Sequence, residues 1–449
     1  MRAVIDAPDD DAPRLAYASW LRAHGESERA EVIVLQCANS DRAATEALLA
    51  QHRSAWERPL GRAAQDVVWV RGFPEAVTLQ YRNPRSLAVL DRAPIRWLWL
   101  RWDEDAGDDD DAPLALARTL AGDPRMARLH GTALTNGSWG EDGAMQLFAS
   151  PHWGELRLVT FGDGDAHAYV AQALARCPSL RRLAELEVVG DYEGDFGDDG
   201  VQILAGAPQL ATLRRLRLNN VALTERAAHA LAESSVLTQL EDIDFGWGSY
   251  NHNQIGTAGA VAIAASPNFR KLQRIVLDHN GIGDAGLAAL AASEHLPELR
   301  TISARAAAIT DAGLHALAAG GGMPKLATLE LTFNNAITGA GIAALAGAPR
   351  FAALETLWLR TCKIGAEGAT AIARTPHATG LRDLNLHECG IDDAGGLELA
   401  GSAHLAGIER LKLSGNALSP ATCERLRERF GDRVDTTGSN VIRERAATL

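Results

Sequence analysis

The sequence predicts an α/β fold built as a solenoid, in which short parallel strands alternate with helices. A Leu-x-x-Leu-x-Leu pattern recurs every 27 or 28 residues between residues 277 and 413, and the stretch after each copy has the apolar spacing of a helix. Hydrophobic residues make up 47% of the 449 residues but aromatic residues only 5%, which suits a long, thin core of aliphatic side chains. A repeat this short cannot bury its own apolar face, so stacked copies must share one sheet and one layer of helices.

The strand half of the repeat is clearest at Leu272, Ile275 and Leu277. Further clear copies end at Leu331, Leu359, Leu386 and Leu413, and weaker copies centre on Leu100, Gly131, Leu158, Val188, Leu218, Phe245 and Ala304. We therefore expect about twelve repeats. A small polar side chain that can satisfy the backbone of the turn follows several strands, namely Asn280, Asn334, Cys362, Cys389 and Asn416.

The helical half of the repeat is exemplified by residues 282–291, and similar segments begin at Ile309, Ile337, Ile364 and Ile391. Apolar positions such as Leu287 and Leu290 should face the core, and a Thr or Asp before the helix should cap it. Small residues such as Gly286 would let the helices of neighbouring repeats approach closely.

This repeat length, with a full helix after each strand, resembles the ribonuclease-inhibitor class of leucine-rich repeats over roughly residues 95 to 430. The resemblance implies a leucine-rich-repeat solenoid shaped as a horseshoe, with the parallel sheet on the concave face and the helices on the convex face. We expect this domain to span residues 81–435, with a helix around 424–430 covering its C-terminal end and a polar tail at 436–449.

Residues 1–80 have a different pattern. The stretch from Pro8 to Leu21 predicts an acidic cap followed by an amphipathic helix, with Leu15, Ala18 and Leu21 on one face. Together with residues 31–36 it resembles a bacterial repeat-companion domain that precedes leucine-rich repeats. Ser19, Val32 and Val34 stand where that family usually has Asp, Phe and Arg, and residues 69–79 resemble its link to the repeats. The resemblance implies a small helical N-terminal cap on the solenoid of a bacterial protein.

Composition limits the partners and the compartment. A formal net charge of -13 argues against nucleic acid as a partner, because phosphate binding requires clustered Lys and Arg. The five cysteines form no CxxC pair, which favours a reducing compartment. The N-terminus lacks the apolar segment of a secretory signal, and no apolar run is long enough to predict a membrane span. We therefore expect a cytoplasmic monomer that binds neither nucleic acid nor membrane.

Three groups of residues invite a chemical interpretation, and each has a simpler one. The acidic run between Asp103 and Asp111 lacks the alternating ligands of a calcium loop, so a solvated loop is favoured. The 13 histidines show no metal-binding spacing. Cys362 and Cys389 share one repeat position, where a disulfide or a shared metal is one interpretation and a structural turn residue is the other. We therefore expect no catalytic residue, no metal and no cofactor.

The neighbours of the buried leucines should face the concave side, because side chains alternate across a strand. Exposed Trp, Arg, Asp and His give this face the composition of protein-binding surfaces. The same parity places Trp97, Trp99, Arg128 and His130 on it, nearer the cap. The residues that we nominate for binding are Arg215, Arg217, Asp242, Asp244, Trp247, Arg274, Asp278, His279, Arg305, Glu330, Phe333, Trp358, Arg360, Asp383, Asn385 and His387.

The favoured hypothesis is a non-enzymatic scaffold that binds a protein or peptide on its concave face. The alternative is a regulator of an enzyme, such as a small-GTPase activator-like protein, since one group of such activators uses a similar repeat class. A third hypothesis is a hydrolase or ligase whose repeats recognise the substrate. The sequence disfavours it, because no segment outside the repeats is long enough for a catalytic domain.

Overall fold

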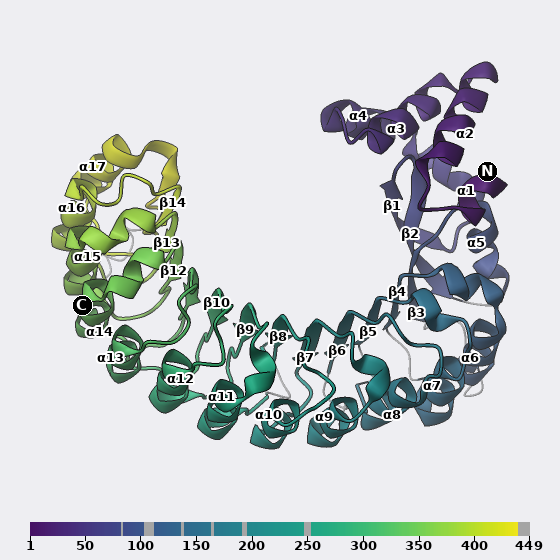
Figure 1. Ribbon diagram of the computed structural model, residues 1–449. Helices are drawn as coiled ribbons and strands as arrows, with labels where there is room; N and C mark the ends of the chain where they lie inside the picture. Colours follow the sequence, from purple (N-terminus) through teal and green to yellow (C-terminus); the bar gives the residue numbers. More distant parts are fainter. Residues whose placement is uncertain are drawn as a thin grey trace. The chain divides into compact units, whose positions relative to one another are not determined.

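The computed structural model describes residues 1–81, 84–102, 112–135, 139–162, 166–190, 195–246 and 253–438. The chain folds into two compact units, Met1–Gly194 and Asp195–Leu449. In each unit, strands and helices alternate along the chain, and the helices cover one side of the sheet (Figure 1).

The first unit begins with four helices and a hairpin, and repeats of strand and helix follow. Its described helices are α1 (Arg2–Asp6), α2 (Asp11–Ala23), α3 (Ser27–Cys37), α4 (Arg42–Glu57), α5 (Val89–Arg92), α6 (Ala112–Gly122), α7 (Gly140–Phe148) and α8 (Ala168–Arg176). Its described strands are β1 (Ala64–Val70), β2 (Phe73–Tyr81), β3 (Trp97–Trp102), β4 (Gly131–Thr135), β5 (Leu158–Gly162) and β6 (Glu185–Val189). β1 and β2 pair antiparallel, whereas β2 to β6 pair in parallel in chain order.

The helix α2 forms as the sequence predicts, but one position of its buried face is different. Asp10 caps the helix by accepting a hydrogen bond from the Ala12 amide at 2.9 Å, and Ala18 and Leu21 are buried. Leu15, expected on the same face, is 42% exposed, and Arg14 is buried instead. The prediction for Leu15 was wrong because Arg14, not Leu15, occupies the buried position in this turn of the helix.

Arg14 is buried because other groups satisfy its guanidinium. Its Nη2 donates to Glu75 Oε1 and to the Pro8 carbonyl, both at 2.6 Å, and its Nη1 donates to the Arg71 carbonyl at 3.2 Å. Arg71 shares the same Glu75 oxygen at 3.3 Å. Burial raises the pKa of Glu75, and the two guanidiniums oppose that effect. This ion cluster ties the start of α2 to the β1–β2 hairpin.

The strand register corrects two anchor positions of the repeat. Leu100 pairs with Leu134, and Leu134 pairs with Phe161, so the anchors are Leu134 and Phe161 rather than Gly131 and Leu158. The first interval is therefore 34 residues (134 minus 100), longer than the sequence alone indicated. The acidic run at 103–111, which falls inside this interval, lies outside the described residues.

The same register has consequences for three residues near β4. Arg128 and His130 precede the strand and so do not belong to its outward row, which corrects their predicted placement. Gly131 lies under Trp97, because a Cβ added there would fall 2.2 Å from the indole ring. The indole of Trp97 is thus half-buried against the next strand, and only glycine fits beneath it.

The second unit consists of regular repeats. Its described helices are α9 (Gly197–Ala205), α10 (Glu225–Ala232), α11 (Gly256–Ala265), α12 (Gly283–Ala292), α13 (Asp311–Ala319), α14 (Gly339–Gly347), α15 (Gly365–Arg374), α16 (Asp393–Gly401) and α17 (Pro420–Phe430). Its described strands are β7 (Arg215–Asn219), β8 (Asp242–Asp244), β9 (Arg274–Val276), β10 (Thr301–Ser303), β11 (Thr328–Glu330), β12 (Thr356–Trp358), β13 (Asp383–Asn385), β14 (Arg410–Lys412) and β15 (Val434–Asp435). Within this unit the strands line the inner side of the curve and the helices lie outside them (Figure 1).

The predicted turn residues satisfy the backbone between repeats. Asn334 is buried, its amide group donates to the Ala304 and Leu331 carbonyls, and its Oδ1 accepts from two amides of the preceding repeat. At the same position the thiols of Cys362 and Cys389 donate to backbone carbonyls at 3.3 and 3.0 Å. All five cysteines are free, and the bonds of these two thiols to backbone carbonyls support the structural interpretation of the pair.

The helix caps are only partly as predicted. Thr310 caps α13 by accepting from the Ala312 amide, but α12 follows Ile282, which has no capping side chain. Asp284, inside the first turn of α12, instead accepts from the amide and hydroxyl of Thr310 at 2.8 and 2.7 Å. The Asp284 carboxylate of one repeat therefore orients Thr310, the capping residue of the next repeat. Its negative charge also lies at the N-terminal end of a helix, where the helix dipole is positive. Among the described residues, no helix has the length and apolar character needed to cross a membrane.

Candidate functional site on the strand face

The solvent-facing side chains of β7 to β14 form two rows, which we call the strand face. The first row is Arg215, Asp242, Arg274, Thr301, Thr328, Thr356, Asp383 and Arg410; the second is Arg217, Asp244, Val276, Ser303, Glu330, Trp358, Asn385 and Lys412. The residues between the rows, such as Ile302 and Leu329, are fully buried. The predicted alternation therefore holds for most of these strands, but Val276, Ser303 and Asp383 of the outward rows are themselves buried.

The nominated residues differ in exposure. Arg215, His279, Phe333 and Arg360 are exposed, and Arg217, Asp242, Asp244, Arg274, Asp278, Arg305, Glu330, Trp358, Asn385 and His387 are half-buried. Trp247 lies outside the described residues. Asp383 is buried under Arg410, whose Nη2 lies 2.7 Å from its Oδ2, so it offers a partner little surface.

The outward rows expected from the sequence included Ser303, Arg410 and Lys412, although these were not nominated for binding, but they left out four members of the strand face. Thr301, Thr328, Thr356 and Val276 occupy outward positions between the nominated residues. The alternation of side chains across a strand predicts these positions too, but threonine and valine lack the charge or aromatic ring that is typical of binding residues. The threonines separate the charged groups at the two ends of the first row.

One end of the strand face consists of mutually neutralised charges. Arg274 lies between two carboxylates, with Nη1 2.8 Å from Asp242 Oδ1 and Nη2 3.3 Å from Asp244 Oδ2. Burial alone would lower the pKa of Arg274, but these carboxylates raise it above its ordinary value. Asp244 also accepts from the side chain of Asn219 at 3.0 Å. These groups satisfy one another, so this end presents little uncompensated charge.

The middle of the face contains a partly buried carboxylate. Burial raises the pKa of Glu330, and the nearby Asp278 raises it further, while Arg305 opposes both effects from 3.3 Å. Asp278 accepts from the Ser303 hydroxyl at 2.6 Å and from the Arg305 amide at 2.9 Å. Arg305 is thereby held at both its backbone and its side chain.

Four neighbouring residues of the strand side combine aromatic surface and positive charge, and two of them, Phe333 and Arg360, are exposed. We call Arg305, Phe333, Trp358 and Arg360 the Phe333 cluster. The guanidinium carbons of Arg305 and Arg360 lie 6.0 and 5.5 Å from the centre of the Phe333 ring, which is cation–π geometry. Phe333 is 38% exposed. The indole Nε1 of Trp358 is buried and has no hydrogen-bond acceptor.

The described residues offer no metal centre. No group of three His, Cys, Asp or Glu side chains in the described ranges is arranged to hold a metal ion. Burial raises the pKa of the Cys362 thiol to about 12, so at neutral pH it is protonated and unreactive. The described part of the strand face presents charged groups, hydrogen-bonding groups and aromatic surface.

Comparison with known proteins supports the repeat assignment. The family model for the leucine-rich repeat matches residues 270–291, 322–346, 354–373 and 377–400. No curated protein sequence matches the chain.

Three solved structures show partial similarity. Rad7 in its yeast complex with Elc1 is 15% identical, with a TM-score of 0.48, over 74% of this chain and 83% of that one. The TLR13–ssRNA13 complex is 17% identical, with a TM-score of 0.45, over 78% of this chain and 42% of that one. The internalin inlF from Listeria monocytogenes is 15% identical, with a TM-score of 0.40, over 86% and 94%. The order of the strands, the buried residues between their two outward rows and the match to the family model together identify the fold as an α/β leucine-rich-repeat solenoid.

Proposed function

We propose that the chain is a non-enzymatic scaffold that binds a protein or peptide on the strand face, centred on the Phe333 cluster. A cytoplasmic location, a bacterial source, a monomeric state and a companion domain at residues 1–80 stay predictions from the sequence. The observation that carries the proposal is the backbone conformation of Phe333.

Phe333 occupies a position that is unfavourable for it. Its φ is 65°, in the left-handed region, where a bulky side chain costs about 1–3 kcal/mol relative to glycine. The equivalent residues of other repeats are also left-handed, among them Ala306, Thr361 and Gly415, with φ of 47°, 62° and 71°. The repeat therefore requires this conformation but does not require an aromatic residue. Retaining an exposed phenylalanine there adds recognition surface at a cost in stability.

The surroundings of Phe333 define what it would bind. Arg360 is exposed, and its guanidinium lies 5.5 Å from the centre of the Phe333 ring. The buried Trp358 Nε1 needs an acceptor. We infer a partner segment that places an apolar side chain on Phe333 and carboxylates against Arg305 and Arg360. Desolvated Trp and Arg side chains beside an aromatic anchor are typical of binding hot spots.

The test uses a substitution that removes the ring without disturbing the fold. Phe333→Gly should bind less than about a tenth of the partner captured from lysate by the wild type, since hot-spot losses reach about 2 kcal/mol or more. The free energy of unfolding should stay the same or rise, because glycine relieves the left-handed strain.

A matched control separates the strand face from general charge effects. Arg374→Ala removes an exposed arginine paired with Glu398, on the helix side of its repeat. We expect this variant to capture the partner as the wild type does. Equal capture by the wild type and Phe333→Gly, or no specific capture by the wild type, would contradict the proposal.

A further inference from the structure

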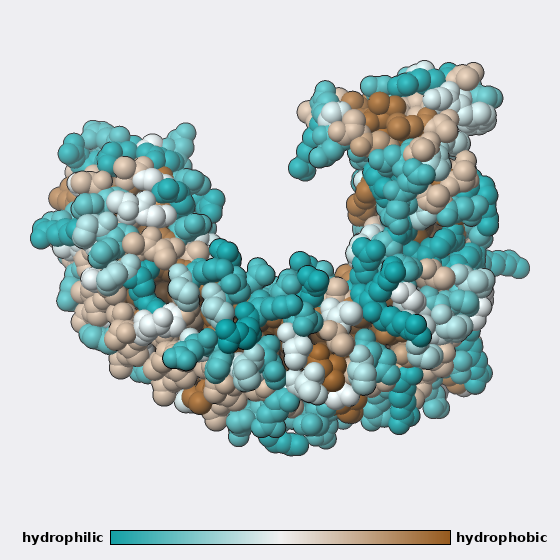
Figure 2. Space-filling model, in the orientation of Figure 1, coloured by the Kyte–Doolittle hydropathy of each residue, from teal (hydrophilic) through white to brown (hydrophobic). Residues whose placement is uncertain are grey.

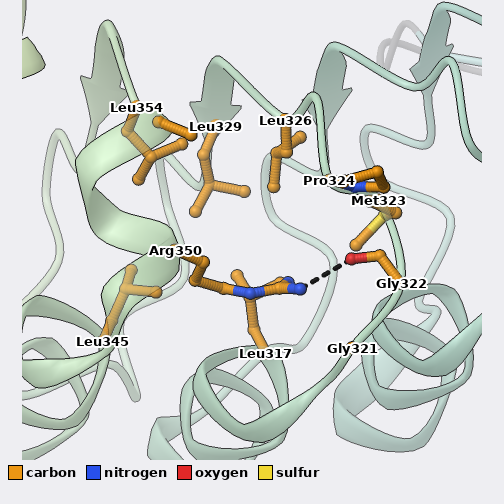
Figure 3. A pocket seen from close by; sticks show the side chains of 11 residues that line it. Leu317, Gly321, Gly322, Met323, Pro324, Leu326, Leu329, Leu345, Arg350 and Leu354 are labelled. Carbon is orange, nitrogen blue, oxygen red and sulfur yellow. Dashed lines mark hydrogen bonds between the residues drawn. The ribbon is translucent and has the colours of Figure 1, made fainter.

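A second feature of the second unit is a largely enclosed cavity of about 80 Å³ between two repeats, away from the strand face. Its apolar wall comes from the buried side chains of Leu317, Met323, Leu326, Leu329, Leu345 and Leu354. Figure 3 shows these side chains around the guanidinium of Arg350. The exposed residues Gly321 and Ala353 also line it, and they mark a route to solvent.

The cavity lies where a ladder of hydroxyl groups is interrupted. At the C-terminal ends of the helices in other repeats, a Ser or Thr donates to a helix carbonyl of the preceding repeat at 2.5 to 2.6 Å; these residues are Ser234, Ser266, Ser293, Thr375 and Ser402. The two repeats at the cavity have Gly320 and Ala348 instead. In place of the hydroxyl missing at Gly320, the Gly322 amide donates to a helix carbonyl of the preceding repeat, that of Ala291, at 2.8 Å.

Arg350 only partly replaces the missing hydroxyls. Its Nη2 donates to the carbonyls of Gly320 and Gly322, both at 2.6 Å. Its Nη1 is buried and has no acceptor. Burial lowers the pKa of this guanidinium, and no carboxylate opposes that effect. Arg350 as a whole is half-buried, but leaving the donors of its buried Nη1 without an acceptor is costly unless an anion satisfies them.

We propose that this cavity binds a short aliphatic carboxylate, with its oxygens on Arg350 Nη1 and its alkyl chain against the leucines. Two N–H donors of one nitrogen, beside an apolar wall, match a carboxylate better than a fully hydrated inorganic anion. A water needs about 10–15 Å³ of such space, so about 80 Å³ holds roughly five water-sized groups or more, which suits butyrate with its six heavy atoms.

The chain contains a reporter for this site. It has four methionines, and Met323 lines the cavity, whereas Met126 lies in the other unit. With ¹³C-methyl methionine, titrating butyrate should shift the Met323 signal and saturate in roughly the millimolar range. The Met126 signal should not move. A Met323→Leu variant assigns the signal.

Charge recognition is tested first on the unaltered protein. Butanol has a similar alkyl chain without the carboxylate. It should therefore bind in the cavity at least about tenfold more weakly than butyrate, as expected for loss of a charge-assisted hydrogen bond. Equal affinity for the two probes would overturn the proposal. Absence of a saturable Met323 shift with butyrate, or an equal shift at Met126, would overturn it as well.

Two variants then locate the site. Arg350→Met keeps an apolar side chain of similar length and should weaken butyrate at least about tenfold. Arg374→Met, which removes an exposed arginine from its pair with Glu398, is the matched control and should bind butyrate normally. Leu317→Phe fills the cavity while leaving Arg350 in place, and it too should abolish the shift. Butyrate binding retained in both cavity variants would place the ligand elsewhere.

Discussion

Removing the side chain of Asn334 tests whether the turn ladder holds the repeats together. In Asn334→Ala the Oδ1 that accepts from the Ala307 and Ile309 amides, each at 3.0 Å, is lost. The two bonds from its amide group to the Ala304 and Leu331 carbonyls, each at 2.8 Å, are lost as well. Asn334 is 2% exposed, so water cannot simply replace it.

The magnitude follows from the groups left without partners. Each buried amide without an acceptor costs about 1–3 kcal/mol, and two are created, so we expect a loss of roughly 2–6 kcal/mol in the free energy of unfolding. Asn334→Cys should fall between the wild type and Asn334→Ala, because a thiol at this position can donate to one carbonyl, as those of Cys362 and Cys389 do.

Urea unfolding followed by circular dichroism measures these differences, with the midpoint and the slope fitted separately. Asn335→Ala, at the exposed neighbouring residue, is the control and should change stability by less than about 0.5 kcal/mol. The reasoning would be refuted if Asn334→Ala lost less than about 1 kcal/mol, or if cysteine were no better than alanine at this position.

Three further predictions concern single residues. Burial and, to a smaller extent, Arg96 lower the pKa of His130 from 6.5 to about 4, so protonation of this residue opposes folding as the pH falls from 6.5 to 4. In pH-dependent melting, the His130→Asn variant should therefore lose less stability than the wild type over this range, by up to about 3 kcal/mol. Arg14→Met leaves the buried Glu75 carboxylate with Arg71 alone, at 3.3 Å, and should cost up to about 3–5 kcal/mol in chemical denaturation, whereas a loss below about 1 kcal/mol would rule out the ion cluster as a support of α2. Gly341→Ala places a Cβ 2.3 Å from Asp311 Oδ1 and should destabilise the protein by about 1–3 kcal/mol. Gly347→Ala in the same helix has no atom within 4 Å of its Cβ and should be neutral or stabilising. Equal effects of the two substitutions would contradict the inference that Gly341 is needed for close approach of neighbouring helices.

Most of the repeat architecture could be predicted because its determinants are local and periodic. The buried positions follow from the spacing of leucines, and the turn residues follow from their fixed distance after each strand. Asn253 shows the limit of this approach. It bonds the backbone as Asn280 does, through the Leu218 and Phe245 carbonyls and two amides. It was missed because it lies in a repeat of 32 residues (277 minus 245), outside the regular spacing.

The remaining errors come from interactions between residues distant in sequence. Nothing near Arg14 in the chain indicates that Glu75 will satisfy it, so burial of the arginine could not be predicted. The register of β4 depends on its pairing with β3, across an insertion that removes the 27-residue spacing. Likewise, the sequence shows Arg350 as an ordinary polar residue after a proline, and only the fold reveals that one of its nitrogens lacks an acceptor.

A solenoid of this kind makes departures from the repeat informative, because each repeat satisfies the backbone of its neighbours in the same way. Phe333 departs by placing an aromatic ring at a left-handed position, and Gly320 and Ala348 depart by omitting a hydroxyl from the ladder. Each departure lowers stability locally, through strain in one case and a half-satisfied cation in the other, and neither improves the packing between repeats. Sequences that violate their own local rules usually do so where function requires it. The two candidate sites therefore rest on separate departures from the repeat, one on the strand face and the other on the helix side of adjoining repeats.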